Sequence, residues 1–175
     1  KEETRGERWY LGDTYHAAIG QGDILVTPLQ IAHVTAAIAN GGTLYSPRVV
    51  DRAGREYESS EPFEPAVLNK QVAPLESVRI IQEGLRAAVT YGTARSLGTL
   101  PVAAAGKTGT AEWAEGKKPH AWFTGYAPYQ NPELVVTVLV EEGEGGDLAA
   151  TPVAKKIFER YFSRFPALDI LEKAR

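Results

Sequence analysis

The sequence predicts an α+β fold, an antiparallel sheet flanked by helices, and three observations lead to this prediction. Apolar residues recur at helical spacing in residues 27–42 and 75–92. Three runs with an extended pattern follow at 102–113, 121–128 and 134–141. The last two runs are joined by the turn sequence Tyr-Gln-Asn-Pro, which is too short for a parallel crossover and therefore requires an antiparallel hairpin.

The first predicted helix has signals at both ends. Thr27 can cap its start, Pro28 suits its first turn, and Gln30 can reach back to the cap amide. Asn40-Gly41-Gly42 ends the helix, because glycine readily takes the left-handed conformation found at helix C-termini.

Between this helix and the sheet, the sequence predicts short strands and a second helix. Residues 43–74 contain four prolines and a charged, hairpin-like stretch around 51–55, so we expect short edge strands and loops there. A helix should then run from Leu75 to a stop at Gly92. Gly84 lowers its helix propensity, which predicts close packing at that point. The apolar residues that recur at spacings of three and four along it are Val78, Ile81, Leu85 and Ala88.

The end of the sequence predicts a buried strand and a final helix. Leu134 to Val140 is apolar on both faces, so we expect an inner strand covered by helices on each side. Thr151-Pro152 opens the last helix and Pro166 stops it. The residues expected along one face of this helix are Val153, Ile157, Tyr161 and Phe165.

The composition excludes several classes of protein. Of 175 residues, 43% are hydrophobic, and 19 Lys and Arg stand against 22 Asp and Glu, so no basic stripe is present to bind nucleic acid. The longest apolar run is far shorter than the roughly 20 residues that cross a bilayer. With no Cys and only three His, at positions without metal-site spacing, no metal site is expected. Because the sequence has no Met, we expect an excerpt or a processed product.

One stretch, residues 104–111, fits neither a core strand nor a solvated surface. It places Lys107 in mid-strand among small residues, so a ligand can approach its ammonium group and the hydroxyls of Thr108 and Thr110. A phosphate-binding loop is disfavoured, because Pro101 stands where that motif needs its leading glycine and no helix follows. Lys107 either discourages pairing at an exposed sheet edge, or belongs to the Lys-Thr-Gly element of the serine acyltransferases that act on acyl-D-Ala-D-Ala ends and β-lactams.

The acyltransferase interpretation is favoured because the similarity extends over almost the whole chain. Seven motifs resemble class B penicillin-binding proteins in order and spacing: residues 9–14 (WYLGDT), 19–22 (IGQG), 27–32 (TPLQIA), 38–42 (IANGG), 106–111 (GKTGTA), 120–129 (HAWFTGYAPY) and 150–154 (ATPVA). The sequence is therefore identified as similar to the C-terminal part of a transpeptidase domain of the elongation type. Residues 1–175 are expected to form one portion of that domain.

The resemblance implies roles for one strand. Lys107, Thr108, Gly109 and Thr110 would line the substrate groove on the third strand of the sheet. Thr110 would give its backbone amide to the oxyanion hole and its hydroxyl to a substrate carboxylate. Lys107 would tune the electrostatics of the site. Gly109, having no side chain, would let the substrate lie against the backbone.

Other motif residues have a structural alternative that stays open. Gly145 and Gly146 fall where the groove of this family is bordered, but a plain loop explains them equally well. Gly20-Gln21-Gly22 marks the family near the floor of the site, or forms a tight turn before Thr27. Trp122 and Phe123 are expected to serve packing.

The resemblance also implies what the parent protein does. It would be a bacterial peptidoglycan D,D-transpeptidase, anchored in the cytoplasmic membrane with this domain on the outer face, that joins stem peptides ending in D-Ala-D-Ala through a serine acyl-enzyme. β-Lactams would trap it, and its partners would be the elongation machinery that sets cell shape, with a SEDS-type glycosyltransferase. The alternatives are a non-catalytic binding or scaffold module, and a D,D-carboxypeptidase or β-lactamase of the same fold.

Two motifs of this family are absent from the sequence. No Ser has Lys three residues later, as the nucleophile motif Ser-x-x-Lys requires, and none has Asn two residues later, as Ser-x-Asn requires. Both are expected upstream, so the chain alone should lack acylation chemistry. If Leu134 to Val140 pairs with a strand of the missing half, the chain by itself should self-associate through an exposed edge.

Overall fold

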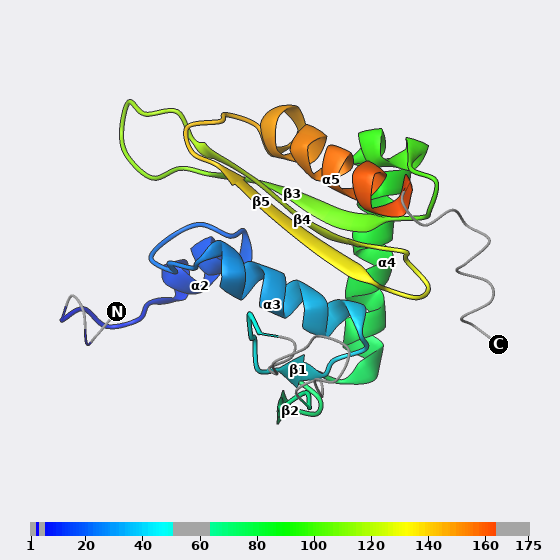
Figure 1. Ribbon diagram of the computed structural model, residues 1–175. Helices are drawn as coiled ribbons and strands as arrows, with labels where there is room; N and C mark the ends of the chain where they lie inside the picture. Colours follow the sequence, from blue (N-terminus) through cyan, green and yellow to red (C-terminus); the bar gives the residue numbers. More distant parts are fainter. Residues whose placement is uncertain (1–2, 4–5, 51–63, 164–175) are drawn as a thin grey trace.

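The structure is a computed structural model that describes residue 3 and residues 6–50 and 64–163. It is α+β, as predicted: an antiparallel sheet lies between helix α5 (Thr151–Ser163) on one face and α3 (Pro28–Ala39) on the other, with α4 (Leu75–Thr90) at one end (Figure 1). No helix in the described part of the chain is long and apolar enough to span a membrane.

The sheet has three strands in the order β3-β4-β5, formed by Ala105–Ala111, His120–Ala127 and Leu134–Val140. Both pairings are antiparallel and regular: Lys107 lies opposite Thr124, which in turn lies opposite Thr137. The strand predictions and the predicted hairpin between β4 and β5 are therefore confirmed. The short strands β1 (Leu44–Tyr45) and β2 (Val67–Asn69) form a separate pair, as expected for that segment. The charged stretch at 51–55 lies outside the described residues.

The predicted caps of α3 are present. The hydroxyl of Thr27 accepts a hydrogen bond from the Gln30 amide at 3.2 Å, and the Thr27 amide donates to the Gln30 side chain at 2.8 Å. Gly41 (φ +89°) and Gly42 (φ +116°) follow the helix in the left-handed region. This reciprocal pair of bonds fixes where α3 begins, and therefore which of its residues face the sheet.

The two faces of the sheet differ in how they are packed. The main core lies on the α5 side, where Phe123 packs with residues of α5 and of the short helix η2 (Arg95–Thr99). The α3 side is more polar: the Thr124 hydroxyl lies 2.8 Å from the hydroxyls of both Thr35 and Thr137. These three hydroxyls tie α3 to β4 and β5.

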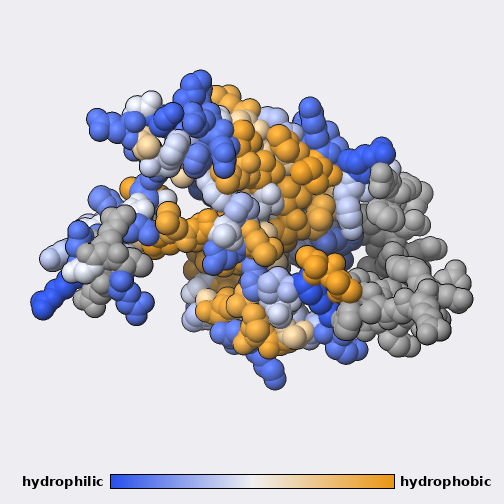
Figure 2. All heavy atoms as spheres, turned by 60° about the vertical axis from the view of Figure 1, so that its left-hand side comes forward, coloured by the Kyte–Doolittle hydropathy of each residue, from blue (hydrophilic) through white to orange (hydrophobic). Residues whose placement is uncertain are grey.

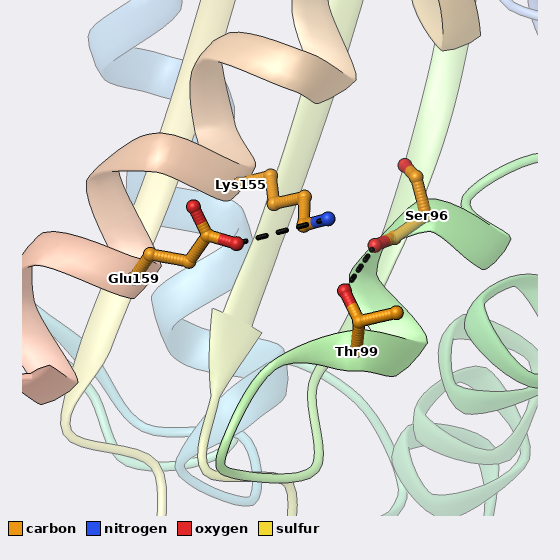
Figure 3. Close-up of polar contacts among 4 residues, drawn as sticks. All are labelled: Ser96, Thr99, Lys155 and Glu159. Carbon is orange, nitrogen blue, oxygen red and sulfur yellow. Dashed lines mark hydrogen bonds and ion pairs between the residues drawn. The ribbon is translucent and has the colours of Figure 1, made fainter.

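Two short-range polar contacts lie at the surface on the α5 side. Lys155 and Glu159 form an i,i+4 ion pair at 3.7 Å, and the Thr99 hydroxyl donates to the Ser96 carbonyl at 3.3 Å within η2 (Figure 3). Such exposed contacts contribute little to stability.

Three expectations about packing are wrong. The buried face of α5 is formed by Thr151, Ala154, Phe158 and Phe162, whereas Val153 and Ile157 are more than 40% exposed. Strand β5 is covered by helices on both faces, but it is an edge of the described sheet, and β4 is its central strand. Gly84 is not closely packed, since a Cβ added there would meet nothing within 4 Å. The predicted end of α5 at Pro166, together with Phe165, lies outside the described residues.

Apolar side chains also lie on the surface. Figure 2 shows them gathered over a broad part of one side of the molecule. In the segment from helix α2 (Leu11–Ala18) to α3, seven are more than half exposed: Leu11, Tyr15, Ile19, Ile24, Leu25, Leu29 and Val34. An exposed apolar surface of this extent is typical of a surface that packs against another unit.

Candidate functional site

The candidate site lies along the outer edge of β3. This strand pairs with β4 on one side and with no strand on the other among the described residues. The Thr110 carbonyl is on the outer side, because it accepts a hydrogen bond from the Gln21 side chain at 3.1 Å. In an antiparallel ladder the N–H and C=O of one residue point to the same side, and every second residue points the same way. The amides of Thr108 and Thr110 therefore point toward the unpaired edge.

Lys107 places its charge at this edge. Its side chain leaves the sheet on the α3 side, shared with its cross-strand partner Thr124. The residue is exposed, and its Nζ donates to the Thr108 carbonyl at 2.6 Å. The edge carbonyls of Thr108 and Thr110 are thus both bonded by side-chain donors. What the edge presents to a ligand is an ammonium group and two backbone N–H groups, an arrangement that favours an anion or a developing oxyanion.

The two threonines of the motif have different surroundings. Thr110 is exposed at the edge. Thr108 is only 9% exposed, and its hydroxyl lies 2.6 Å from the hydroxyl of Thr93, just after α4. The Thr108 hydroxyl therefore ties β3 to the end of α4, and a ligand contact by Thr108 is left to its backbone amide.

The glycines beneath the edge are required by close packing. A Cβ at Gly106 would lie 2.6 Å from Cζ of Phe123, and one at Gly109 would lie 3.2 Å from Cβ of Trp122. Gly146, the first residue of the short π-helix η3 (Gly146–Ala150), packs against the Gly109 backbone: a Cβ there would lie 2.6 Å from the Gly109 oxygen. Gly145 precedes it at the end of the loop after β5.

The structure therefore brings Gly146 to the strand of the motif, on the face opposite Lys107. Phe123 is fully buried and Trp122 is half-buried, in line with the packing expected for them.

The loop from β3 to β4 is tied to the segment before η3. Lys118 and Glu144 form an exposed ion pair at 2.7 Å, and the Glu144 amide donates to the Pro119 carbonyl. Their hydrogen bond, reinforced by charge, raises the pKa of Lys118 and lowers the pKa of Glu144. Because both side chains are exposed, this pair orients the loop more than it stabilises the fold.

Sequence reasoning missed the helix α2 and the contact that it makes possible. The tight turn at Gly20-Gln21-Gly22 was one of the two interpretations of this motif, and the structure contains it, with Gly20 at φ +74° and Gly22 at φ +93°. The same turn brings Gln21 to Thr110. Two glycines around a polar residue were the available signal, but they do not indicate which strand that residue contacts.

An edge strand with Lys-Thr-Gly-Thr, backed by helices on both faces of an antiparallel sheet, is the arrangement of the penicillin-interacting acyltransferases. Comparison with known families agrees, since a model of the penicillin-binding protein transpeptidase domain matches residues 1–159. The chain belongs to this family. Several of its relatives are MrdA or PBP2 proteins, which agrees with the elongation-type resemblance.

Among curated proteins, the chain is 32% identical to peptidoglycan D,D-transpeptidase MrdA of Haemophilus influenzae over 97% of its length. It is 36% identical to peptidoglycan D,D-transpeptidase PbpA of Mycolicibacterium smegmatis over 77% of its length. The chain spans only 29% of the first relative and 28% of the second.

Solved structures give the same result. The chain is 34% identical to Pseudomonas aeruginosa PBP2 in complex with WCK 5153, with a TM-score of 0.75, covering 92% of this chain and 36% of that one. It is 31% identical to penicillin-binding protein A of Mycobacterium tuberculosis as an imipenem acyl-enzyme, with a TM-score of 0.71, covering 84% and 33%. A Helicobacter pylori complex between PBP2 and MreC has a TM-score of 0.72 at 29% identity, covering 94% and 29%.

Proposed function

We propose that this chain is the C-terminal portion of the transpeptidase domain of a peptidoglycan D,D-transpeptidase, and that the edge of β3 is one wall of its substrate groove. One observation carries the proposal: in a chain of this family, Lys107 and the Thr108 and Thr110 amides converge on the unpaired edge of β3. An extended peptide can add to such an edge through backbone hydrogen bonds.

The chemistry follows from what this edge offers. A serine from outside the chain attacks the carbonyl carbon of the penultimate D-Ala, and the carbonyl oxygen becomes an oxyanion. The Thr110 amide donates to that oxygen, while Lys107 and the Thr110 hydroxyl face the terminal carboxylate. The peptide bond breaks, D-Ala leaves with a proton on its nitrogen, and the acyl group remains on the serine. An amine of a neighbouring stem peptide then takes the acyl group and restores the serine.

β-Lactams would acylate the same serine, because their strained amide occupies the position of the D-Ala-D-Ala bond. Gly109 would let either ligand approach the strand, while Gly145 and Gly146 would border the groove from beneath. No step in this scheme calls for a metal ion or an organic cofactor.

The proposed partners follow from the relatives and from the exposed surface. The missing part of the transpeptidase domain, with the Ser-x-x-Lys and Ser-x-Asn motifs, would cover the apolar residues between α2 and α3. One structural neighbour is PBP2 in complex with MreC, and another belongs to a peptidoglycan synthase complex. By analogy, the parent would work with elongation machinery that includes a SEDS-type glycosyltransferase, at the outer face of a bacterial cytoplasmic membrane.

The test is the intact mass of the full-length gene product with and without benzylpenicillin, with this 175-residue chain as the control. We expect a single penicillin adduct on the full-length protein and none on the chain. No adduct on either would refute the proposal and favour a non-catalytic module. Rapid release of hydrolysed penicillin, or of D-Ala without cross-linking, would instead indicate a β-lactamase or a D,D-carboxypeptidase.

A further inference from the structure

Gln21, just after α2, contacts the candidate site directly. Its Nε2 donates to the Thr110 carbonyl at 3.1 Å, across a separation of 89 residues in the sequence. This carbonyl belongs to the residue whose amide points to the unpaired edge of β3. A single side-chain contact therefore acts directly on the residue that presents the amide.

The backbone around Gln21 is held in place by the end of α2. The Gln21 amide donates to the His16 carbonyl at 2.9 Å, and the Gly20 amide donates to the Ala17 carbonyl at 3.0 Å. With Gly20 at φ +74°, these two bonds form a Schellman motif, the arrangement that ends many helices at a glycine. Gly22 is also left-handed, at φ +93°. The turn thus fixes the backbone position of Gln21, from which its side chain reaches β3.

The contact matters because edge strands are easily displaced. Lys107 and Gln21 bond the outward carbonyls of Thr108 and Thr110, and no neighbouring strand holds that side in the described part of the sheet. The position of an oxyanion donor matters, because a misplacement of about 1 Å can lower the rate by about 10²-fold. A donor on the Thr110 carbonyl restrains the rotation of the strand about its axis, and with it the direction of the Thr110 amide.

We propose that Gln21 is a positioning residue for acyl transfer, which orients the Thr110 amide through its hydrogen bond to the Thr110 carbonyl. The proposal rests on the function proposed above. It assigns no contact between Gln21 and the reacting atoms. Gln21 acts on the oxyanion only through Thr110, so its loss should slow acylation while leaving initial binding of the ligand almost unchanged.

The experiment uses the full-length gene product with Gln21→Met, which removes the donor without adding charge, and Gln21→Glu, which keeps the shape but cannot donate. Gln130→Glu is the matched control, because it makes the same charge change at an exposed turn at the opposite end of the sheet. Stopped-flow measurements with benzylpenicillin give the acylation rate constant and the dissociation constant of the non-covalent complex. Hydrogen exchange of peptides covering residues 106–113 reports on β3 without requiring any reaction.

Both Gln21 variants should lose about tenfold in the acylation rate constant, the effect of one lost hydrogen bond, with the dissociation constant changed less than about twofold. Exchange in residues 106–113 should become faster, the unfolding midpoint should stay near the wild-type value, and Gln130→Glu should behave as wild type. Acylation at the wild-type rate or faster, or a loss that appears only with a lower unfolding midpoint, would overturn the proposal. If the wild-type protein is not acylated at all, the proposed function fails, and unchanged exchange in the Gln21 variants would still reject the contact.

Discussion

Gly146 offers a sharp test of how the site is supported. A Cβ at this position would lie 2.3 Å from the Trp122 oxygen, 2.6 Å from the Gly109 oxygen and 3.0 Å from the Gly109 nitrogen. All three are backbone atoms of a paired position in β3 and β4, so none can move as a flexible side chain can. Gly146→Ala must therefore shift η3 or distort the sheet.

The expected cost follows from these distances. Forcing a methyl group into a closely packed site typically costs about 1–3 kcal/mol. Because three backbone contacts fall at or below 3.0 Å, we expect the upper part of this range, about 2–3 kcal/mol. For a domain of this size, that corresponds to a fall of roughly 4–12 °C in the unfolding midpoint.

The neighbouring glycine supplies the control. A Cβ at Gly145 would meet only the side chains of Asp147, at 2.8 Å from Oδ1, and Leu148, at 3.6 Å or more. Both can rotate away, so Gly145→Ala should cost under about 1 kcal/mol. Thermal and urea unfolding of the two variants in the full-length protein would measure the difference. Equal stability of the two variants would refute the packing argument.

Three further predictions concern stability and assembly. Burial, with a smaller contribution from Tyr129, raises the pKa of Tyr126 to about 12, and its buried hydroxyl has no hydrogen-bond partner among the described residues. The neutral phenol is therefore favoured in the folded state, and stability should fall as the pH rises from 10 through 12, by about 1.4 kcal/mol at pH 11. Tyr126→Phe should be at least as stable as wild type at pH 8 and should lack this loss, and identical pH dependences of the two unfolding curves would contradict the assignment. Thr124→Val should lower the free energy of unfolding in urea by about 1–2 kcal/mol, because it leaves the Thr137 hydroxyl without its partner at 2.8 Å. An unchanged free energy would show that the hydroxyls of Thr35, Thr124 and Thr137 do not tie α3 to the sheet. The 175-residue chain alone should form dimers or larger species in sedimentation, because the outer edge of β5 is unpaired in the described sheet; a monomer at all concentrations would count against this.

Local rules predicted the helix ends and strand positions well. The Thr27 and Gln30 pair and the glycines after Asn40 act within a few residues, so the sequence contains all of the information that fixes them. The strands β3 and β4 begin within three residues of their predicted starts, and β5 begins at the predicted residue. The motif on β3 was found because its meaning depends on residue type and order rather than on distant contacts.

The wrong predictions concern features that are determined by packing between segments far apart in the sequence. In α5 the stripe of large apolar residues was expected to face the core, but small Thr151 and Ala154 let the helix approach closely, so Phe158 and Phe162 turn inward instead of Ile157. Strand β5 is apolar on both sides because helices cover both faces, and this pattern does not determine the position of a strand within its sheet.

The finer geometry of the site could not be predicted for the same reason. The Thr93 partner of Thr108 and the Gln21 partner of Thr110 come from segments whose placement depends on the whole fold. Helix α2 has no buried residue, and its apolar Leu11 and Tyr15 are exposed, so packing within the described part of the chain does not fix its position.

The central claim is that the outward amide of Thr110 at the edge of β3 stabilises the oxyanion of acyl transfer. Thr110→Pro tests it directly in the full-length protein, because proline removes this N–H while every ladder bond to β4 is kept. Thr110→Ala is the control, since it removes only the hydroxyl. The account predicts that Thr110→Pro loses about 10²-fold or more in the rate of acylation by benzylpenicillin, while Thr110→Ala stays within about tenfold of wild type. A Thr110→Pro protein that is folded and acylated at the wild-type rate would contradict it.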